Sequence, residues 1–358
     1  MLKEIGRGLT LSSEIRRDYL LNRWVIIAAE RAKRPVDFIV PKKKTKVSTC
    51  SFCPGNERMT PPATLVYIGE KSGKITRTRD TDSKRMKNWL VRSVPNLYPA
   101  LKPISKLPFK TSMGGYKVRP GIGHHEVLIE SPDHDEHPSV ARPKQLGLAI
   151  RACIDRLNVL SKKRYVKYVS IFRNYRPEAG ASISHAHSQI IATSILPNLI
   201  EEELQASRKF REREGGCALC EVVANEIKGP RVIYQNANFV AIAPWASVYN
   251  FEFWVLPKRH SPSISYAKPY EIDGLAIAMR SCLGGLSRLL RDPPYNLGFH
   301  LAPSSTRGRH YHWHVEVYPK LGSIGGFELS TGMYINTMPP ERAAEALRGA
   351  VNQERTCL

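Results

Sequence analysis

The stretch SISHAHSQIIA, residues 182–192, places two histidines one residue apart at the start of an apolar run. If the stretch is a β-strand, residues i and i+2 share a face, so the rings of His185 and His187 point the same way. A later stretch, HWHVEVYP at 312–319, repeats the arrangement with His312 and His314. One such repeat means little alone, but it suggests a search for two copies of one folding unit.

Other motifs recur in the same order and support this duplication. Each copy begins with a Cys-x-x-Cys pair, and an apolar, β-rich run follows that ends in proline and then histidine: Cys50/Cys53 with His134, and Cys217/Cys220 with His260. The step from the single histidine to the His-x-His is 51 residues in the first copy and 52 in the second. Three features in one order indicate a tandem repeat. The first copy is longer, which we interpret as an insertion around residues 69–88.

Hydrophobic periodicity gives each copy the same elements. Apolar residues recur at helical spacing over 143–162 and again over 270–291, and a β-like segment follows each helix, at 165–172 and 295–302. A Glu- and Arg-rich helix over 198–213 would join the copies. We therefore predict an α+β fold of two tandem halves, residues 1–197 and 198–358, each a mainly antiparallel sheet with packed helices.

Composition limits the cellular context and the partners. The chain has 358 residues, of which 42% are hydrophobic, yet no apolar run approaches a membrane span and the N-terminus has no apolar signal core. These features predict a cytoplasmic protein. The net charge of +22 indicates anionic partners, and a nucleic-acid-binding role is one alternative. The basic residues are spread along the chain, however, and form no single arm or aromatic-interleaved helix.

The cysteines and histidines suggest metal sites. Zinc takes thiolate and imidazole ligands in a tetrahedron, and a Cys-x-x-Cys turn supplies two of the four. The best candidate sets are Cys50, Cys53, His134 and His185 in the first half, and Cys217, Cys220, His260 and His312 in the second. His310 and His314 compete with His312 in the second set. The alternatives are a reducible disulfide or unused thiols.

His187 would remain free if His185 binds a metal. A metal fixes its neighbour and so positions the second imidazole as a nucleophile. Imidazole can attack the α-phosphorus of a nucleotide and carry the nucleotidyl group as a phosphoramidate. The preceding loop fits a phosphate cradle, because Gly180 permits close backbone approach and Ser182 and Ser184 offer hydroxyls. An ordinary turn is the alternative.

The spacing Asn174-x5-Gly180-x-Ser182-x2-His185-x-His187-x-Gln189 resembles the active-site motif of galactose-1-phosphate uridylyltransferases, in the histidine-triad superfamily. The likeness extends to RWVIIAAERAKRP (23–35), VPNLYPAL (94–101) and GGFELSTGMYIN (325–336). It implies two histidine-triad-like halves and a homodimer with the active site near the subunit interface.

Roles follow from the resemblance only where residues match. It implies that His187 becomes uridylylated and that Gln189, with Ser182 nearby, holds phosphoryl oxygens. Asn174 and Gly180 match phosphate-loop positions, Asn96 a nucleotide-contacting asparagine, Arg34 a phosphate-reaching basic residue, and Phe327-Glu328 an aromatic-Glu pair on the hexose. The first Cys2His2 set matches the zinc ligands of the family.

Two departures from the family pattern are present, a mild one at Ala186 and a more informative one in the second metal set. Ala186 replaces the proline usual between the histidines. Some bacterial members hold a second metal, which could be iron, with a glutamate and histidines, here Glu203, His300, His312 and His314. A branch resembling ADP-glucose phosphorylase has a second Cys2His2 zinc instead, and this chain carries parts of both patterns.

These observations favour a ping-pong uridylyltransferase. His187 would take UMP from UDP-glucose and pass it to galactose 1-phosphate. Gln189 stands where hydrolytic relatives have a third histidine, and an amide cannot serve as the acid/base for water attack. The alternatives are an ADP-glucose phosphorylase, with phosphate as acceptor, and a zinc-stabilised nucleic-acid-binding protein. Two zinc ions per chain are expected, with an active site in the first half only, because Glu316 replaces Gln189 in the second.

Overall fold

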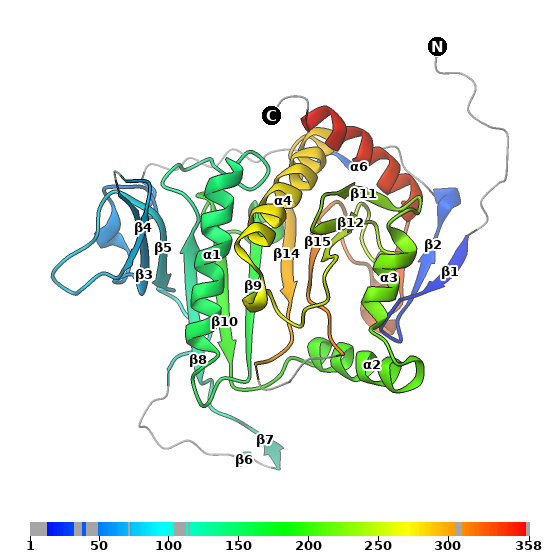
Figure 1. Ribbon diagram of the computed structural model, residues 1–358. Helices are drawn as coiled ribbons and strands as arrows, with labels where there is room; N and C mark the ends of the chain where they lie inside the picture. Colours follow the sequence, from blue (N-terminus) through cyan, green and yellow to red (C-terminus); the bar gives the residue numbers. More distant parts are fainter. Residues whose placement is uncertain are drawn as a thin grey trace.

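A computed structural model describes residues 13–31, 38–40, 49–70, 72–103, 112–113, 115–304 and 310–355. Its centre is one 11-stranded antiparallel sheet (Figure 1). In spatial order the strands are β11 (Val232–Gln235), β12 (Phe239–Ile242), β13 (Phe253–Pro257), β15 (His314–Pro319), β14 (Tyr295–His300), β9 (Tyr168–Tyr175), β10 (His187–Thr193), β8 (Gly123–Ile129), β5 (Trp89–Pro95), β3 (Leu65–Gly69) and β4 (Ile75–Thr78).

The duplication is visible in this strand order. Reading outward from the central β9–β14 pair, β9, β10, β8, β5 and β3 of the first half match β14, β15, β13, β12 and β11 of the second. The α+β class and the paired halves are thus as predicted, although their strands join in a continuous sheet. The extra residues of the first half lie in two places, not one. The β3–β5 connection contains β4, and the β5–β8 connection contains β6 (Ser112–Met113) and β7 (Tyr116–Lys117).

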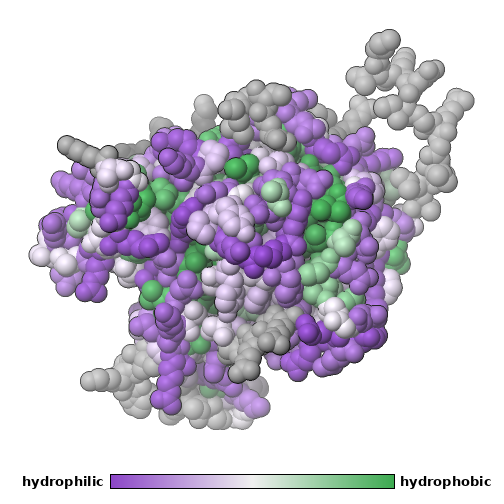
Figure 2. Space-filling model, viewed as in Figure 1, coloured by the Kyte–Doolittle hydropathy of each residue, from purple (hydrophilic) through white to green (hydrophobic). Residues whose placement is uncertain are grey.

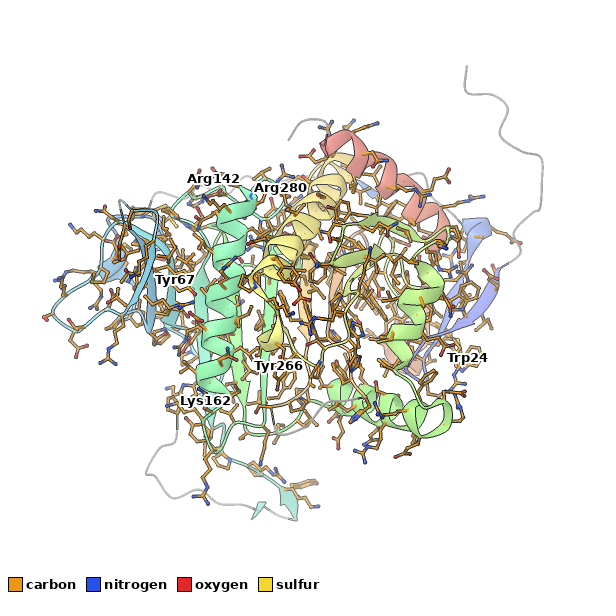
Figure 3. All side chains as sticks on the ribbon, viewed as in Figure 1. Trp24, Tyr67, Arg142, Lys162, Tyr266 and Arg280 are labelled. Atoms are coloured by element: carbon orange, nitrogen blue, oxygen red, sulfur yellow. The ribbon has the colours of Figure 1, made fainter. Side chains whose placement is uncertain are left out.

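Two equivalent long helices cover one face of the sheet. α1 (Pro143–Leu160) and α4 (Pro269–Leu290) lie side by side (Figure 1), and the guanidinium of Arg151 donates to Asp273 at 2.6 Å between them. Both begin with proline at the first helical position, where its missing N–H costs nothing. Figure 3 shows Tyr67 of β3 beside α1, where its hydroxyl donates to Asp155 at 2.6 Å.

The remaining helices join or flank the halves. α2 (Asn198–Glu214) connects them, as the sequence predicts, and α3 (Ala218–Glu226) follows the second cysteine pair. α6 (Pro340–Arg355) packs on α4, with Val351 against Gly285, and the short α5 (Gly326–Thr331) precedes β16. Short 3-10 turns lie at Ala29–Arg31, Glu57–Met59, Pro177–Ala179 and Ile264–Tyr266. None of the described helices is long and apolar enough to cross a membrane.

A separate three-stranded sheet ties the start of the chain to the second half. β1 (Glu14–Arg17) pairs with β2 (Trp24–Ile27), and β2 pairs in parallel with β16 (Tyr334–Asn336). This sheet stands at one edge of the molecule (Figure 1). The division of the chain at 197/198 remains a prediction.

The large sheet has one helix-covered face and one face that carries the sites. On β10, Ile190 and Ala192 belong to the main core beside α1 and α4, so by the two-residue period His187 and Gln189 face the other way. On β15, Val315 and Val317 are in the same core. In the view of Figure 2 the surface is mostly hydrophilic, with hydrophobic residues in scattered groups.

Candidate functional site

The first cysteine pair lies against the site face of the first half. Between the two cysteines, Phe52 is buried in a small apolar cluster with Val127 and Ile129 of β8. Its ring meets those of His185 and His187 edge-on, with centroids 6.1 and 5.6 Å away. The Cys-x-x-Cys turn is therefore held directly beside the His-x-His segment.

The structure brings the four predicted ligands of the first set together. The candidate ligand atoms of Cys50, Cys53, His134 and His185 all lie within 4.8 Å of one another. Cys53 Sγ is 3.4 Å from His134 Nδ1 and 3.5 Å from His185 Nδ1. Zinc bonds of about 2.0–2.3 Å give tetrahedron edges of about 3.3–3.8 Å, so these separations fit zinc.

Hydrogen bonds orient these histidines for a metal. The Nε2–H of His185 donates to the Ser131 carbonyl at 2.8 Å, which leaves its Nδ1 unprotonated beside the thiols. His134 Nε2 lies 2.9 Å from the Ser184 hydroxyl. Ser184 thus contacts a candidate ligand, whereas the sequence placed it in a phosphate cradle.

The second set assembles in the same way. Cys217, Cys220, His260 and His312 form a group within 4.8 Å, with Cys220 Sγ 3.3 Å from His260 Nδ1 and 3.2 Å from His312 Nδ1. The Nε2–H of His312 donates to the Pro257 carbonyl at 2.9 Å, as His185 does to Ser131. His310 and His314 lie outside this group.

A third group holds the rest of the alternative metal set. Glu203, His300 and His314 gather with Glu316, not with His312, and all four are buried. Here His300 Nδ1 donates to Glu203 at 2.8 Å and His314 Nε2 donates to Glu316 at 3.0 Å. Burial by itself would lower the pKa of His300, but the two carboxylates outweigh it and raise the pKa to about 9. The group is thus paired internally.

His187 begins β10 with one ring nitrogen engaged. Its Nδ1–H donates to the His185 carbonyl at 2.7 Å, and among the described residues no protein group pairs with its Nε2. Burial lowers the pKa of the ring, so the neutral form dominates at neutral pH. A neutral imidazole with its proton on Nδ1 presents a lone pair at Nε2, which is the state a nucleophile requires.

A buried ion pair holds the backbone of this histidine. The guanidinium of Arg173 on β9 donates to the His187 carbonyl at 2.9 Å and pairs with Glu130, which also accepts from Ser188 at 2.5 Å. Sequence reasoning missed these residues, because charged residues within a strand are not in themselves a signal.

The loop before His-x-His is fixed from both halves. Gly180 has φ +88°, which favours glycine, and its carbonyl accepts from the Asn174 amide at 3.4 Å. Asn296 of β14 donates to Asn174 Oδ1 at 2.9 Å and to the Ala179 carbonyl at 2.7 Å. Ser182 is exposed on this loop. Asn296 gave no sequence signal, because it is a lone asparagine in the other half.

The remaining predicted residues fall in different places. Gln189 follows on the same face of β10 and accepts from His125 at 2.8 Å, and Asn96 lies beside that histidine. Phe327 and Glu328 lie on α5, where Glu328 accepts from Gly325 N–H and caps the helix. No described hydrogen bond joins them to the surroundings of His187. Arg34 lies outside the described residues.

Comparison with known proteins agrees with this geometry. Residues 77–197 match the N-terminal domain model of galactose-1-phosphate uridyl transferase, and residues 143–356 match a domain of unknown function. The chain is 33% identical to the ADP-glucose phosphorylase of Arabidopsis thaliana over 94% of this chain and 93% of that protein. It is 28% identical to the galactose-1-phosphate uridylyltransferase of Thermotoga maritima, over 94% and 98%.

The chain belongs to the galactose-1-phosphate uridylyltransferase family. Solved structures agree with this. The Arabidopsis thaliana ADP-glucose phosphorylase with bound ADP-glucose superposes with a TM-score of 0.76 at 31% identity, covering 94% of this chain and 98% of that one. A uridylyltransferase superposes with 0.74 at 26% identity, covering 97% and 100%. The resemblance read from His187, Gln189 and their spacing is confirmed, and the family is one of nucleotidyltransferases.

Proposed function

We propose that this chain transfers a nucleotidyl group from a sugar nucleotide by way of His187. One observation carries the proposal: among the described residues the Nε2 of His187 is unpaired, while its Nδ1–H is held by the His185 carbonyl. Attack of Nε2 on the α-phosphorus breaks the bond to the sugar-phosphate oxygen and forms a phosphoramidate. The sugar 1-phosphate departs, and an acceptor phosphate oxygen then takes the nucleotidyl group from the histidine.

Within this chemistry we favour ADP-glucose as donor and inorganic phosphate as acceptor. AMP would pass to His187 with release of glucose 1-phosphate, and phosphate would then take AMP to give ADP. The 33% identity to an ADP-glucose phosphorylase and the assembled second Cys2His2 group support this choice. Uridylyl exchange between UDP-glucose and galactose 1-phosphate, which the sequence favoured, is the second candidate and is supported by the Thermotoga maritima relative.

We further infer that both Cys2His2 groups hold zinc. The first zinc would fix the segment from which His187 projects, since His185 is a ligand and His187 begins the next strand. Zinc here supplies rigidity and takes no part in the chemistry of the nucleotidyl group.

We also propose a homodimer. Phe327 and Glu328 lie on α5, next to β16 of the three-stranded edge sheet, and no described hydrogen bond joins them to the surroundings of His187. In a dimer, their sugar-binding role would be exercised in the site of the partner subunit. Sedimentation analysis tests the oligomeric state.

The decisive experiment traps the intermediate. The protein is mixed with ADP-glucose or UDP-glucose labelled at the α-phosphorus. The label that remains bound to the protein through an acid-sensitive, base-stable linkage is then counted. Phosphate or galactose 1-phosphate is then added, and release of ADP or UDP-galactose is measured. If ADP-glucose labels the protein and phosphate removes the label, the phosphorylase is supported. If UDP-glucose labels the protein and galactose 1-phosphate removes the label, the uridylyltransferase is supported. No label from either rejects transfer through His187.

A further inference from the structure

A backbone amide sets the tautomer of the His125 ring on β8. Its Nδ1 lies 3.1 Å from the N–H of Ala100, which can only donate, so Nδ1 accepts and carries no proton. The neutral ring must then carry its proton on Nε2. That nitrogen lies 2.8 Å from Gln189 Oε1, so the Nε2–H of His125 donates to the glutamine.

This contact fixes which end of the Gln189 amide faces His125 and which end faces away from it. The two ends of a glutamine amide have nearly the same shape, and a half-turn of the last torsion exchanges oxygen for nitrogen. With Oε1 bound to His125, the NH2 group points elsewhere, and no protein group accepts from it in the part of the chain that the structure describes. Gln189 shares its sheet face with His187, two residues away on β10.

The same imidazole also touches the predicted nucleotide contact. Asn96 Oδ1 accepts from the backbone N–H of Tyr98 at 2.9 Å, so its amide nitrogen is the end 3.1 Å from His125 Nε2. Because both of these nitrogens carry protons, Asn96 lies against the imidazole without accepting its proton, and the proton goes to Gln189. His125 therefore stands between Asn96 and Gln189. The register places it across the β10–β8 pair, where it faces Ile191, a residue on the same side as Gln189.

We propose that His125 is a positioning residue for nucleotidyl transfer. It turns the NH2 of Gln189 toward the phosphoryl oxygens and the carbonyl away from them. This inference rests on the proposed function. Without His125 the amide can rotate and present its oxygen to the phosphoryl group, where two acceptors repel. The NH2 stabilises the charge that develops as Nε2 of His187 attacks, so its loss slows the chemical step.

Two variants distinguish the loss of the His125–Gln189 hydrogen bond from the loss of the packing of the imidazole. His125→Gln keeps an N–H near the position of the imidazole Nε2, whereas His125→Met fills similar space without a donor. The measurement is the single-turnover rate of protein labelling at saturating α-labelled ADP-glucose, repeated with UDP-glucose. We expect His125→Met to slow labelling about 10- to 100-fold, with the melting temperature unchanged, and His125→Gln to recover most of that loss.

A double-mutant cycle decides the route of the effect. In a Gln189→Ala background, His125→Met should cause no further loss, because the amide that it orients is gone. An equal loss in both backgrounds, or full activity of His125→Met alone, overturns the inference. If the unmodified protein takes no label from either sugar nucleotide, the proposed function fails and this inference with it. If the unmodified protein takes label and His125→Met takes it at the same rate, only the inference about His125 is overturned and the proposed function stands.

Discussion

His187 and His314 occupy equivalent positions at the starts of β10 and β15, yet their surroundings differ at one nitrogen. Both rings face a carbonyl through Nδ1, at 2.7 Å for His187 and 3.2 Å for His314. Nε2 of His314 faces Glu316, whereas Nε2 of His187 has no described protein partner. A single residue, Gln189 or Glu316, therefore distinguishes an Nε2 with an available lone pair from an Nε2 that donates its proton to a carboxylate.

Replacement of His187, the proposed nucleophile, should separate activity from folding. We expect His187→Ala to abolish labelling by the sugar nucleotide with little loss of stability, because the candidate metal ligand is His185. His187→Gly should regain turnover when imidazole is added, since free imidazole can fill the space and attack in its place. Steady-state assays with and without imidazole measure both effects, and substantial turnover by His187→Ala would remove this residue from the mechanism.

We expect Gln189 to control the fate of the proposed nucleotidyl-histidine intermediate. We expect Gln189→His to raise hydrolysis of the sugar nucleotide relative to transfer, because a titratable imidazole can take a proton from water and an amide cannot. The measurement is the ratio of free nucleoside monophosphate to transfer product. Gln189→Asn, which keeps an amide, serves as the control. An unchanged ratio in Gln189→His with transfer intact would contradict this role.

At the scale of the element, the loop between β9 and β10 depends on glycine at one point. Gly180 has φ +88°, a conformation that costs a residue with Cβ about 1 kcal/mol. We expect Gly180→Ala to lower the free energy of unfolding by about that amount and to slow labelling, because the loop contacts Asn174 and Asn296. Gly216→Ala is the matched control, since Gly216 has no positive φ and no described atom lies within 4 Å of the place where a Cβ would stand. Equal effects of the two substitutions on labelling would refute a role of the β9–β10 loop in nucleotidyl transfer.

Local pattern predicted the elements well. The helix expected at 143–162 spans Pro143–Leu160, that at 270–291 spans Pro269–Leu290, and that at 198–213 spans Asn198–Glu214. Amphipathic spacing is strong over such lengths, because one face of each helix must be buried. Both Cys2His2 groups also came from spacing, since a tight turn supplies two ligands and the repeat supplies the others.

Long-range pairing was not predictable in the same way. The sequence does not encode that β9 and β14 pair edge to edge, or that β2 pairs with β16, because any strand edge offers the same backbone groups. His125 lies 64 residues from Gln189 and Asn296 lies 122 from Asn174. Neither has a local pattern that marks it, so only the folded sheet brings these side chains to the site.

For the whole molecule, the matched halves predict one reactive histidine per chain. The nucleotide should label the protein at one site, because Glu316 accepts from His314 Nε2 and its carboxylate repels a phosphoryl group. Mass spectrometry of the trapped adduct measures this number. His314→Ala should leave the amount of label unchanged, whereas His187→Ala should remove it. A second labelled histidine would show that both halves are active.

The three groups of candidate ligands differ in the chemistry they offer a metal. The two Cys2His2 groups present thiols and imidazole Nδ1 atoms at tetrahedral separations, while the carboxylates and histidines around Glu203 already hydrogen-bond to one another. We therefore expect two zinc ions per chain, one for each Cys2His2 group. Inductively coupled plasma mass spectrometry of the purified protein gives the count. Cys220→Ser should lose one zinc, whereas Glu203→Ala should lose no metal.

Because binding energy at such sites is also folding energy, a chelator should lower the melting temperature of the unmodified protein. Iron in the protein that disappears in Glu203→Ala would instead assign the second metal to the glutamate-histidine group.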